Sequence, residues 1–300
     1  MSPEVDWRAL LEALVRVEQL REEDSGLLSF GPAPSGAVFV ERGRICWVAA
    51  HGLQRRLRDL VLTRSNIDPT ELERIYERCR AERRFFGQTL VDEGWIQASE
   101  LEWALRRHSA ESVVALCRGN QYTTWLTHRG PGYAPQFTFR ASDILGDVVG
   151  LLAPEAQRAA EQELASLQGP GRRGGAFLFE PDTEIAVPLA GFGADQSLES
   201  ACLLGRWASA VPLATKELGG AQAFALAVTA AGDTVAVWSR QDLLFAIVCE
   251  ERESIAALTA RFLNARAEDA QAEAHCTPSN STSNKSVAFG GITPPAPRAP

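Results

Sequence analysis

The sequence predicts an α+β fold in which helices flank two groups of short antiparallel strands. The first observation is a set of three β-rich runs between residues 27 and 50, joined by glycine-bearing turns, which predicts a small β-meander. The second is a change in the order of predicted elements after Pro154, where a helix, two strands, a long helix and three further strands follow one another. With 300 residues, of which 45% are hydrophobic and 23% are charged, the chain is expected to form about two globular domains.

The first half is expected to surround its meander with helices. The clearest helix start is at Asp68, where Asp68 is a suitable N-cap, Pro69 suits the first helical position and Glu71 suits the third. Ser142 is expected to cap the last helix of this half. The elements expected around the meander are, in order, helices over 6–20, 52–63, 68–83 and 98–116, strands over 121–127 and 136–140, and a helix over 142–152.

The second half is expected to begin at Pro154, which suits the first turn of a new helix. The glycine-rich tract 168–175 predicts a flexible hinge, and Pro212 is expected to kink or split the long helix. The elements expected here are helices over 154–167, 197–218 and 254–267, and strands over 176–180, 184–189, 223–229, 234–239 and 243–249. We therefore predict domains over 1–152 and 153–268, followed by a disordered tail over 269–300 rich in Ser, Thr, Asn, Pro and Ala.

Charge and hydropathy exclude several classes of protein. The formal net charge of −8 argues against broad nucleic-acid or anionic-membrane binding. No apolar run approaches the ~20 residues that a membrane-spanning helix needs, so membrane insertion is not expected. Charged residues such as Glu4, Asp6 and Arg8 stand where a signal peptide would be apolar, which favours a cytoplasmic location.

Residues that carry chemistry do not cluster in the sequence. The four histidines lie far apart without Cys or acidic partners at ligand spacing, so no metal site is expected. Neither a P-loop nor a G-x-S-x-G motif is present, and the six scattered cysteines are expected to be small apolar core residues. We therefore predict that the chain is not an enzyme and has no catalytic, cofactor-binding or metal-binding residues.

The second half resembles the roadblock domain, the family shared by dynein light chains and bacterial GTPase regulators. The resemblance is carried by the hairpin over 175–187, the helix over 197–218 and the meander over 224–248, in a profilin-like α-β-β-α-β-β-β-α order. It implies a non-enzymatic regulator that forms a homodimer and engages a small Ras-like GTPase. Roadblock dimers pair through the long central helix and the strand after it, which here implies the segments 197–218 and 223–229.

The first half resembles the PATAN-type domain of bacterial regulatory proteins. The resemblance covers roughly residues 7–150 and is carried by the opening helix, by Gly26–Phe30, and by the stretch Gly36–Ile45 that leads into Trp47–Ala50. It implies a scaffold or adaptor in signalling or motility.

A third similarity lies inside the first half and leaves an alternative function open. Six residues are spaced as in the N-terminal domain of pilus and type II secretion ATPases, where a related repeat can bind cyclic di-GMP: Gly87, Leu90, Gly94, Ile96, Leu101 and Leu105. Phe85 and His108 depart from that pattern, and a single copy is present where nucleotide binding uses two. The alternatives are therefore a cyclic di-GMP sensor through 85–108 or a helical subdomain packed by its leucines and isoleucine.

Two surface features complete the predictions. The arginine clusters at 55–58, 80–84 and 106–107 are expected to form solvated helix faces balanced by glutamates such as Glu71, Glu73, Glu77 and Glu82. Four apolar residues on the roadblock-like elements are the candidate protein interface, because Trp and Leu on such elements can anchor a partner: Leu203, Leu204, Trp207 and Trp238.

Overall fold

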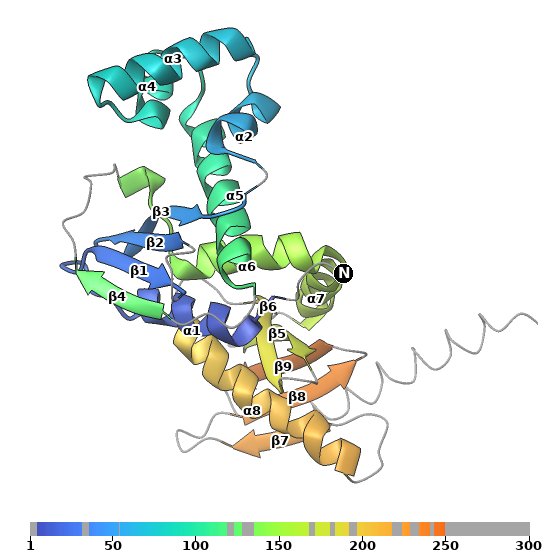
Figure 1. The fold of residues 1–300 in the computed structure, drawn as a ribbon. Helices are drawn as coiled ribbons and strands as arrows, with labels where there is room; N and C mark the ends of the chain where they lie inside the picture. Colours follow the sequence, from blue (N-terminus) through green and yellow to red (C-terminus); the bar gives the residue numbers. More distant parts are fainter. Residues whose placement is uncertain are drawn as a thin grey trace, which may run out of the picture. The chain divides into compact units, whose positions relative to one another are not determined.

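The computed structural model describes eleven segments of the chain: residues 5–31, 36–53, 55–118, 123–127, 135–167, 172–180, 184–191, 197–217, 224–228, 234–240 and 243–249 (Figure 1). Within these residues the fold is α+β, with eight α-helices and two antiparallel sheets. Residues Met1–Glu253 form one compact unit. The helix expected over 254–267 and the tail expected over 269–300 lie outside the described residues.

The predicted β-meander is confirmed and forms most of the first sheet. The sheet has the order β3-β2-β1-β4, so a strand from much later in the chain pairs with the first one. Its strands are β1 (Gly26–Phe30), β2 (Gly36–Glu41), β3 (Arg44–Ala50) and β4 (Thr123–Thr127). The strand expected over 136–140 is wrong: a 3-10 turn occupies Pro135–Phe137, and Phe139 forms only an isolated bridge with Ile45.

Helices account for the rest of the first half. Their bounds are α1 (Trp7–Glu18), α2 (Leu57–Arg64), α3 (Pro69–Glu82), α4 (Phe86–Asp92), α5 (Ala98–Leu116) and α6 (Ala141–Leu152). The Asp68 cap is confirmed, because its carboxylate accepts from the backbone N–H of Thr70 at 2.9 Å and of Glu71 at 3.3 Å. Ser142 is not the cap of α6. Arg140 holds that position, with its N–H donated to the Asp143 carboxylate at 3.1 Å.

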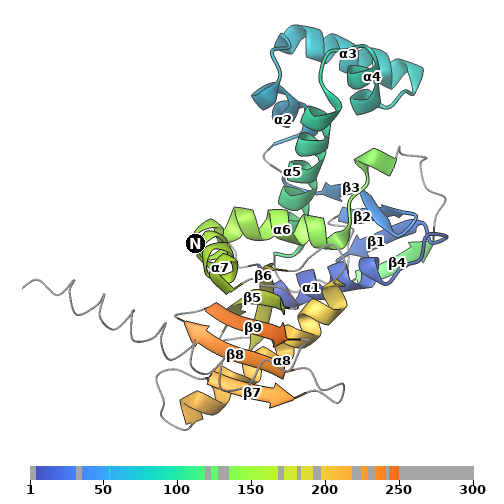
Figure 2. The same ribbon diagram turned by 180° about the vertical axis from the view of Figure 1, so that it is seen from behind.

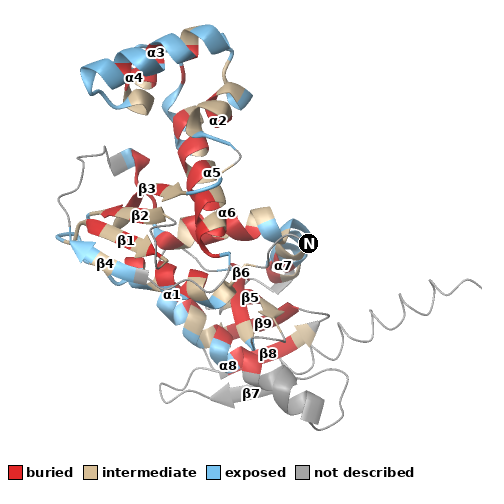
Figure 3. Cartoon of the chain, in the orientation of Figure 1, coloured by how far each residue is buried: buried red, intermediate tan, exposed pale blue. Residues whose placement is uncertain are grey.

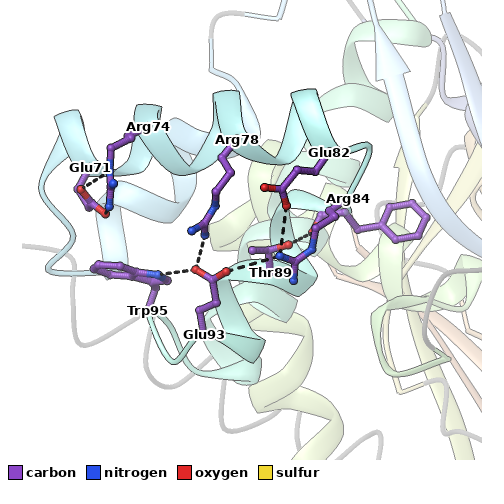
Figure 4. A network of polar contacts seen from close by, with 9 residues as sticks. Glu71, Arg74, Arg78, Glu82, Arg84, Thr89, Glu93 and Trp95 are labelled. Atoms are coloured by element: carbon purple, nitrogen blue, oxygen red, sulfur yellow. Dashed lines mark hydrogen bonds and ion pairs between the residues drawn. The ribbon is translucent and has the colours of Figure 1, made fainter.

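Helices α3 and α4 are joined by a network of ion pairs on their outer side (Figure 4). Arg78 of α3 pairs with Glu93, which also accepts from the Trp95 indole N–H at 3.2 Å and lies 3.7 Å from Arg84. Beneath the network, a small apolar core is fully or almost fully buried, as expected for a helical subdomain packed by its leucines and isoleucine: Leu72, Ile75, Leu90, Ile96, Leu101 and Leu105.

The second half consists of one sheet with helices against it. The sheet has the order β6-β5-β9-β8-β7 and is antiparallel at every pair. Helix α8 crosses one face of the sheet, and α7 packs against β5 and β6 (Figures 1 and 2). The elements are α7 (Pro154–Leu167), β5 (Arg172–Glu180), β6 (Ile185–Ala190), α8 (Leu198–Glu217), β7 (Phe224–Val228), β8 (Thr234–Arg240) and β9 (Leu243–Cys249).

One expectation for the second half is wrong in part, and another is half answered. The hinge expected over 168–175 does not include residues 172–175, because β5 begins at Arg172 and pairs there with β9, while residues 168–171 lie outside the described residues. Helix α8 continues through Pro212, so it does not split there, and a kink at Pro212 stays a prediction. A proline inside a helix removes one backbone hydrogen bond and bends the helix, and the packing of α8 against β6, β8 and β9 favours one continuous helix despite that cost.

The core of the second half lies between α8 and the sheet. Figure 3 shows buried residues in β5 and β9 of this sheet. Phe177 of β5 is fully buried in the core and belongs to the same cluster as Ala208 of α8. Gly205 lets the helix approach closely, since a Cβ there would lie 3.0 Å from the Phe177 ring. The other buried members of this core are Ala186, Val235, Val237, Leu244 and Ala246.

The predicted boundary falls at Ala153, between α6 and α7. Across it, α1 packs against α8 and β6, and α6 packs against α7 and β6. The two halves are therefore in contact across this boundary. Their division into domains over 1–152 and 153–268 stays a prediction.

Candidate functional site

The outer face of α8 carries two exposed apolar side chains. Leu203 is 57% exposed and Trp207 is 39% exposed, and their i,i+4 spacing places them on the same side of the helix. The opposite side of α8 is buried on the sheet through Ala201, Gly205 and Ala208. Local sequence produces this pattern, because small residues recur at helical spacing on the buried side and large apolar residues remain outside.

The other two predicted interface residues lie elsewhere. Leu204 is half-buried and packs against the core between α8 and the sheet. Trp238 of β8 is only 9% exposed and stacks on Phe245 of β9, with ring centroids 5.3 Å apart. The structure therefore brings Leu203 and Trp207 together on one surface, which we call the α8 face, and places Trp238 inside the domain.

A cleft of about 570 Å³ borders the α8 face where α8 meets α1 and the start of β6. Leu11 and Val15 of α1 line one wall, and Cys202 and Leu203 line the other. Burial raises the pKa of the Cys202 thiol to about 11, so it is not a reactive thiolate at neutral pH.

The strand after α8 forms one edge of the second sheet. In the described part of the chain, β7 pairs with β8 and with no other strand. An unpaired strand edge presents backbone N–H and C=O groups that another strand can satisfy. The α8 face and the β7 edge are therefore two features of the described part of this half that suit a protein partner.

A larger cavity, of about 750 Å³, lies in the first half among β3, α2, α3, α4 and α5. Its lining is rich in aromatic rings, with Trp47 from β3, Tyr76 from α3, and Phe85 and Phe86 at the start of α4. Tyr76 and Phe85 are 37% and 46% exposed, which is unusual for rings of this size. The segment 85–108 of the alternative hypothesis thus supplies part of a real cavity.

His108 lies at the floor of this cavity. Its ring stacks on the Trp47 indole with centroids 4.4 Å apart and is 5% exposed. Burial lowers the pKa of His108, which keeps the imidazole neutral at physiological pH, and the nearby Glu111 carboxylate opposes this shift. Its Nδ1 lies 3.5 Å from the Ser112 hydroxyl on the next turn of α5.

Three arginines from one short segment also line the cavity. Arg55 pairs with Glu111 of α5, and Arg58 pairs with Glu73 of α3. None of the ion pairs found among the described residues involves the third, Arg56. The expected pairing of arginines with glutamates therefore holds for Arg55 and Arg58 in this cluster, although Glu111 was not among the glutamates named, whereas Arg56 brings positive charge to the cavity.

Sequence reasoning missed this cavity. Its parts are separated by about 50 residues in the chain, between the segment 47–58 and the segment 101–108, and the contact of α5 with β3 brings them together. A local signal was present, since His51, Arg55, Arg56 and Arg58 follow Trp47 closely. In the sequence alone, these basic residues look like the solvated face of a helix. Only the fold shows that aromatic rings lie in the same cavity lining.

Other kinds of site receive no support from the residues that the structure describes. Among them, no group of three or more His, Cys, Asp or Glu side chains is placed to hold a metal ion. No helix in those segments is both long and apolar enough to cross a bilayer. Cys46, Cys79 and Cys117 are buried as expected for core residues, and burial raises the pKa of Cys46 and of Cys117 to about 12.

No protein-family model matches this sequence, and no curated protein or solved structure matches it either. Function is therefore inferred from the residues and contacts described above.

Proposed function

We propose that the chain is a non-enzymatic cytoplasmic regulator whose second half is a roadblock-type domain that pairs with a second copy and engages a small Ras-like GTPase. The first half would act as a PATAN-type adaptor. The observation that carries the proposal is the order α7-β5-β6-α8-β7-β8-β9, which follows the roadblock pattern as far as the described residues extend, with large apolar side chains on the outside of its central helix.

The second copy is the occupant that best fits this surface. Edge strands of two identical chains can pair antiparallel about a twofold axis, which extends the sheet and gives β7 a second strand partner on the side where the described residues provide none. The same axis would bring two α8 helices together, and Leu203 and Trp207 would then be buried by their symmetry mates. Large apolar side chains near the centre of an interface contribute most of its binding energy.

A GTPase partner needs no catalytic group from this chain. A protein that binds one conformation of the partner's switch loops more tightly shifts the population of the partner toward that conformation. We expect the dimer to bind the GTP-loaded and GDP-loaded forms with different affinities, because such a difference is the only means by which binding can shift the equilibrium.

Light scattering on the full chain at tens of micromolar tests the pairing. We expect a dimer for the parent chain and a monomer for Leu203→Asp and Trp207→Asp, because a charge would be buried at the interface. Leu126→Asp on β4 is the matched control, since Leu126 is 52% exposed but lies outside the α8 face. A monomeric parent chain, or a dimer that survives both α8 substitutions, would overturn the proposal.

The partner is tested with a purified small Ras-like GTPase from the same organism. Its affinity for the parent chain is measured in both nucleotide states, and the rate of GTP hydrolysis by its GTP-loaded form is measured with and without the parent chain. Equal affinity for both states, together with an unchanged hydrolysis rate, would contradict the GTPase part of the proposal and leave the pairing intact.

A further inference from the structure

We propose that the cavity between β3 and α2–α5 is a binding site for a nucleoside phosphate. This inference does not rest on the proposed pairing, because the cavity is built by residues 47–137 and the pairing by α8 and β7. Its volume of about 750 Å³ lies within the range of cavities that hold small molecules, roughly 300–1,000 Å³.

The charge of the cavity lining favours a negatively charged ligand. Arg55, Arg56 and Arg58 line the cavity, and the described lining includes no aspartate or glutamate. The whole chain carries a formal net charge of −8, so this cluster stands out against an acidic background. Glu73 and Glu111 hold Arg58 and Arg55 in place from outside the lining, which leaves Arg56 to receive the anion.

The arginines favour a phosphate over a single carboxylate. All three come from four consecutive positions and line the same cavity. Each guanidinium offers paired N–H donors that match the oxygen atoms of a phosphate group. A ligand with two or more negative charges at one end makes the best use of this arrangement.

The aromatic rings of the lining favour a ligand whose uncharged part is planar. Tyr76, Phe85 and Phe86 come from α3 and the start of α4, and the mutually stacked rings of Trp47 and His108 bring β3 and α5 into the lining. Planar heterocycles stack on such rings, and the interaction is worth a factor of about ten or more in affinity per base. A phosphate at one end and a planar base at the other are together the chemistry of a nucleotide.

The buried imidazole gives the site a polar group for recognition. His108 is 5% exposed and lines the cavity, and its one hydrogen-bond contact found among the described residues is the long one of 3.5 Å from Nδ1 to Ser112. Because its pKa is lowered by burial, the neutral ring offers one donor and one acceptor rather than a second cation. A base edge with both kinds of group complements it.

The test is isothermal titration calorimetry on the full chain with ATP, GTP, GMP and cyclic di-GMP. Guanosine serves as a control ligand that has the base but no phosphate, and inorganic pyrophosphate as one that has the phosphate charge but no base. We expect at least one nucleotide to bind, and to bind about tenfold or more tightly than either fragment. Which nucleotide binds best distinguishes a cyclic di-GMP site from one for a mononucleotide.

Two substitutions locate the binding. Arg56→Ala and Phe85→Ala should each weaken nucleotide binding about tenfold, because one removes a cation that forms no ion pair with the described residues and the other removes a stacking ring. Both side chains are exposed, so the fold should persist, and a thermal melt verifies it. The matched controls are Arg80→Ala on α3 and Trp95→Ala after α4, which are an exposed cation and an exposed ring outside the lining.

Three results would overturn the inference. The first is the absence of binding by every nucleotide at millimolar concentration. The second is equal affinity for pyrophosphate and nucleotides, which would make the cavity a simple anion site. The third is nucleotide binding that both cavity variants leave unchanged, which would place the site elsewhere. None of these results bears on the pairing through α8, which light scattering measures separately.

Discussion

The side-chain carboxylate of Glu18, the last residue of α1, accepts a hydrogen bond from the backbone N–H of Leu198, the first residue of α8. The same oxygen accepts from the N–H of Glu199 at 3.3 Å. The first N–H groups of a helix have no partner within the helix, and an anion there is favoured by the helix dipole. The first half of the chain thus caps the central helix of the second half.

Removing this cap should lower the stability of the whole chain. Glu18→Ala leaves the Leu198 N–H without its acceptor, and loss of a helix cap costs roughly 0.5–2 kcal/mol. Glu18→Gln keeps an amide oxygen in the same place and should cost less. Urea denaturation of the parent chain and the two variants measures the free energy of unfolding. Equal losses of stability for Glu18→Ala and Glu18→Gln would show that the side-chain oxygen at position 18 does not cap α8.

The pH dependence of the Glu18 cap follows from its burial. Burial raises the pKa of the Glu18 carboxyl above the usual 4.5, and the two backbone hydrogen bonds only partly oppose the shift. The native state therefore binds this proton more tightly than the unfolded chain, so the contribution to stability is fully present below about pH 4.5 and is lost as pH rises through the folded pKa. Glu18→Gln cannot ionise, so it should gain stability relative to the parent between about pH 4 and pH 7. The opposite trend would mean that the hydrogen bonds outweigh burial.

Two helical glycines should respond to alanine in opposite directions. A Cβ at Gly205 would lie 3.0 Å from the Phe177 ring and 3.1 Å from the Ala186 carbonyl oxygen, and the fully buried Phe177 has no room to move. Overpacking costs about 1–3 kcal/mol, which exceeds the gain in helix propensity of about 1 kcal/mol. A Cβ at Gly146 of α6 meets no atom within 4 Å, so Gly146→Ala should stabilise by about 0.5–1 kcal/mol. Thermal melts of both variants test the pair, and stabilisation by Gly205→Ala would contradict the close contact of α8 with β5.

The features that sequence predicted best depend on local interactions. The Asp68 cap involves residues two and three positions away, and the meander from β1 to β3 depends on short turns. Patterns of this kind are complete within a dozen residues, so the sequence determines them without knowledge of the rest of the fold.

The features that sequence missed depend on distant partners. Residues 172–175 form a strand because β9, about 70 residues later, pairs with them, and Gly174 allows its close approach. Trp238 was expected at a surface, but its ring is buried against Phe245, and only the sheet order determines that. The cavity has the same origin, because Trp47 and His108 meet only when α5 packs on β3.

An ion pair between α5 and α6 offers a direct measure of electrostatic coupling. Arg106 contacts both carboxylate oxygens of Asp147, at 2.8 and 2.9 Å, and this hydrogen bonding raises the pKa of Arg106. Both side chains are about one-third exposed, so a double-mutant cycle with Arg106→Ala and Asp147→Ala should give a coupling of about 0.5–1 kcal/mol. The coupling should shrink at high salt, because solvent ions screen partly exposed charges. A coupling that is unchanged in about 1 M salt would be inconsistent with this account.

The stability of the chain should fall in mild acid because of His108. Burial lowers the pKa of this ring below the usual 6.5, and its closest partners are the neutral Trp47 indole and the Ser112 hydroxyl. The unfolded chain therefore binds the proton more readily than the native state, so the contribution of His108 to stability is fully present above about pH 6.5 and is lost as pH falls through the folded pKa. His108→Gln stays neutral, so the parent should lose more stability than this variant between about pH 7.5 and pH 5. Urea denaturation followed by tryptophan fluorescence measures both slopes. Identical slopes would contradict this account, because they would show that the native and unfolded states bind the His108 proton equally well.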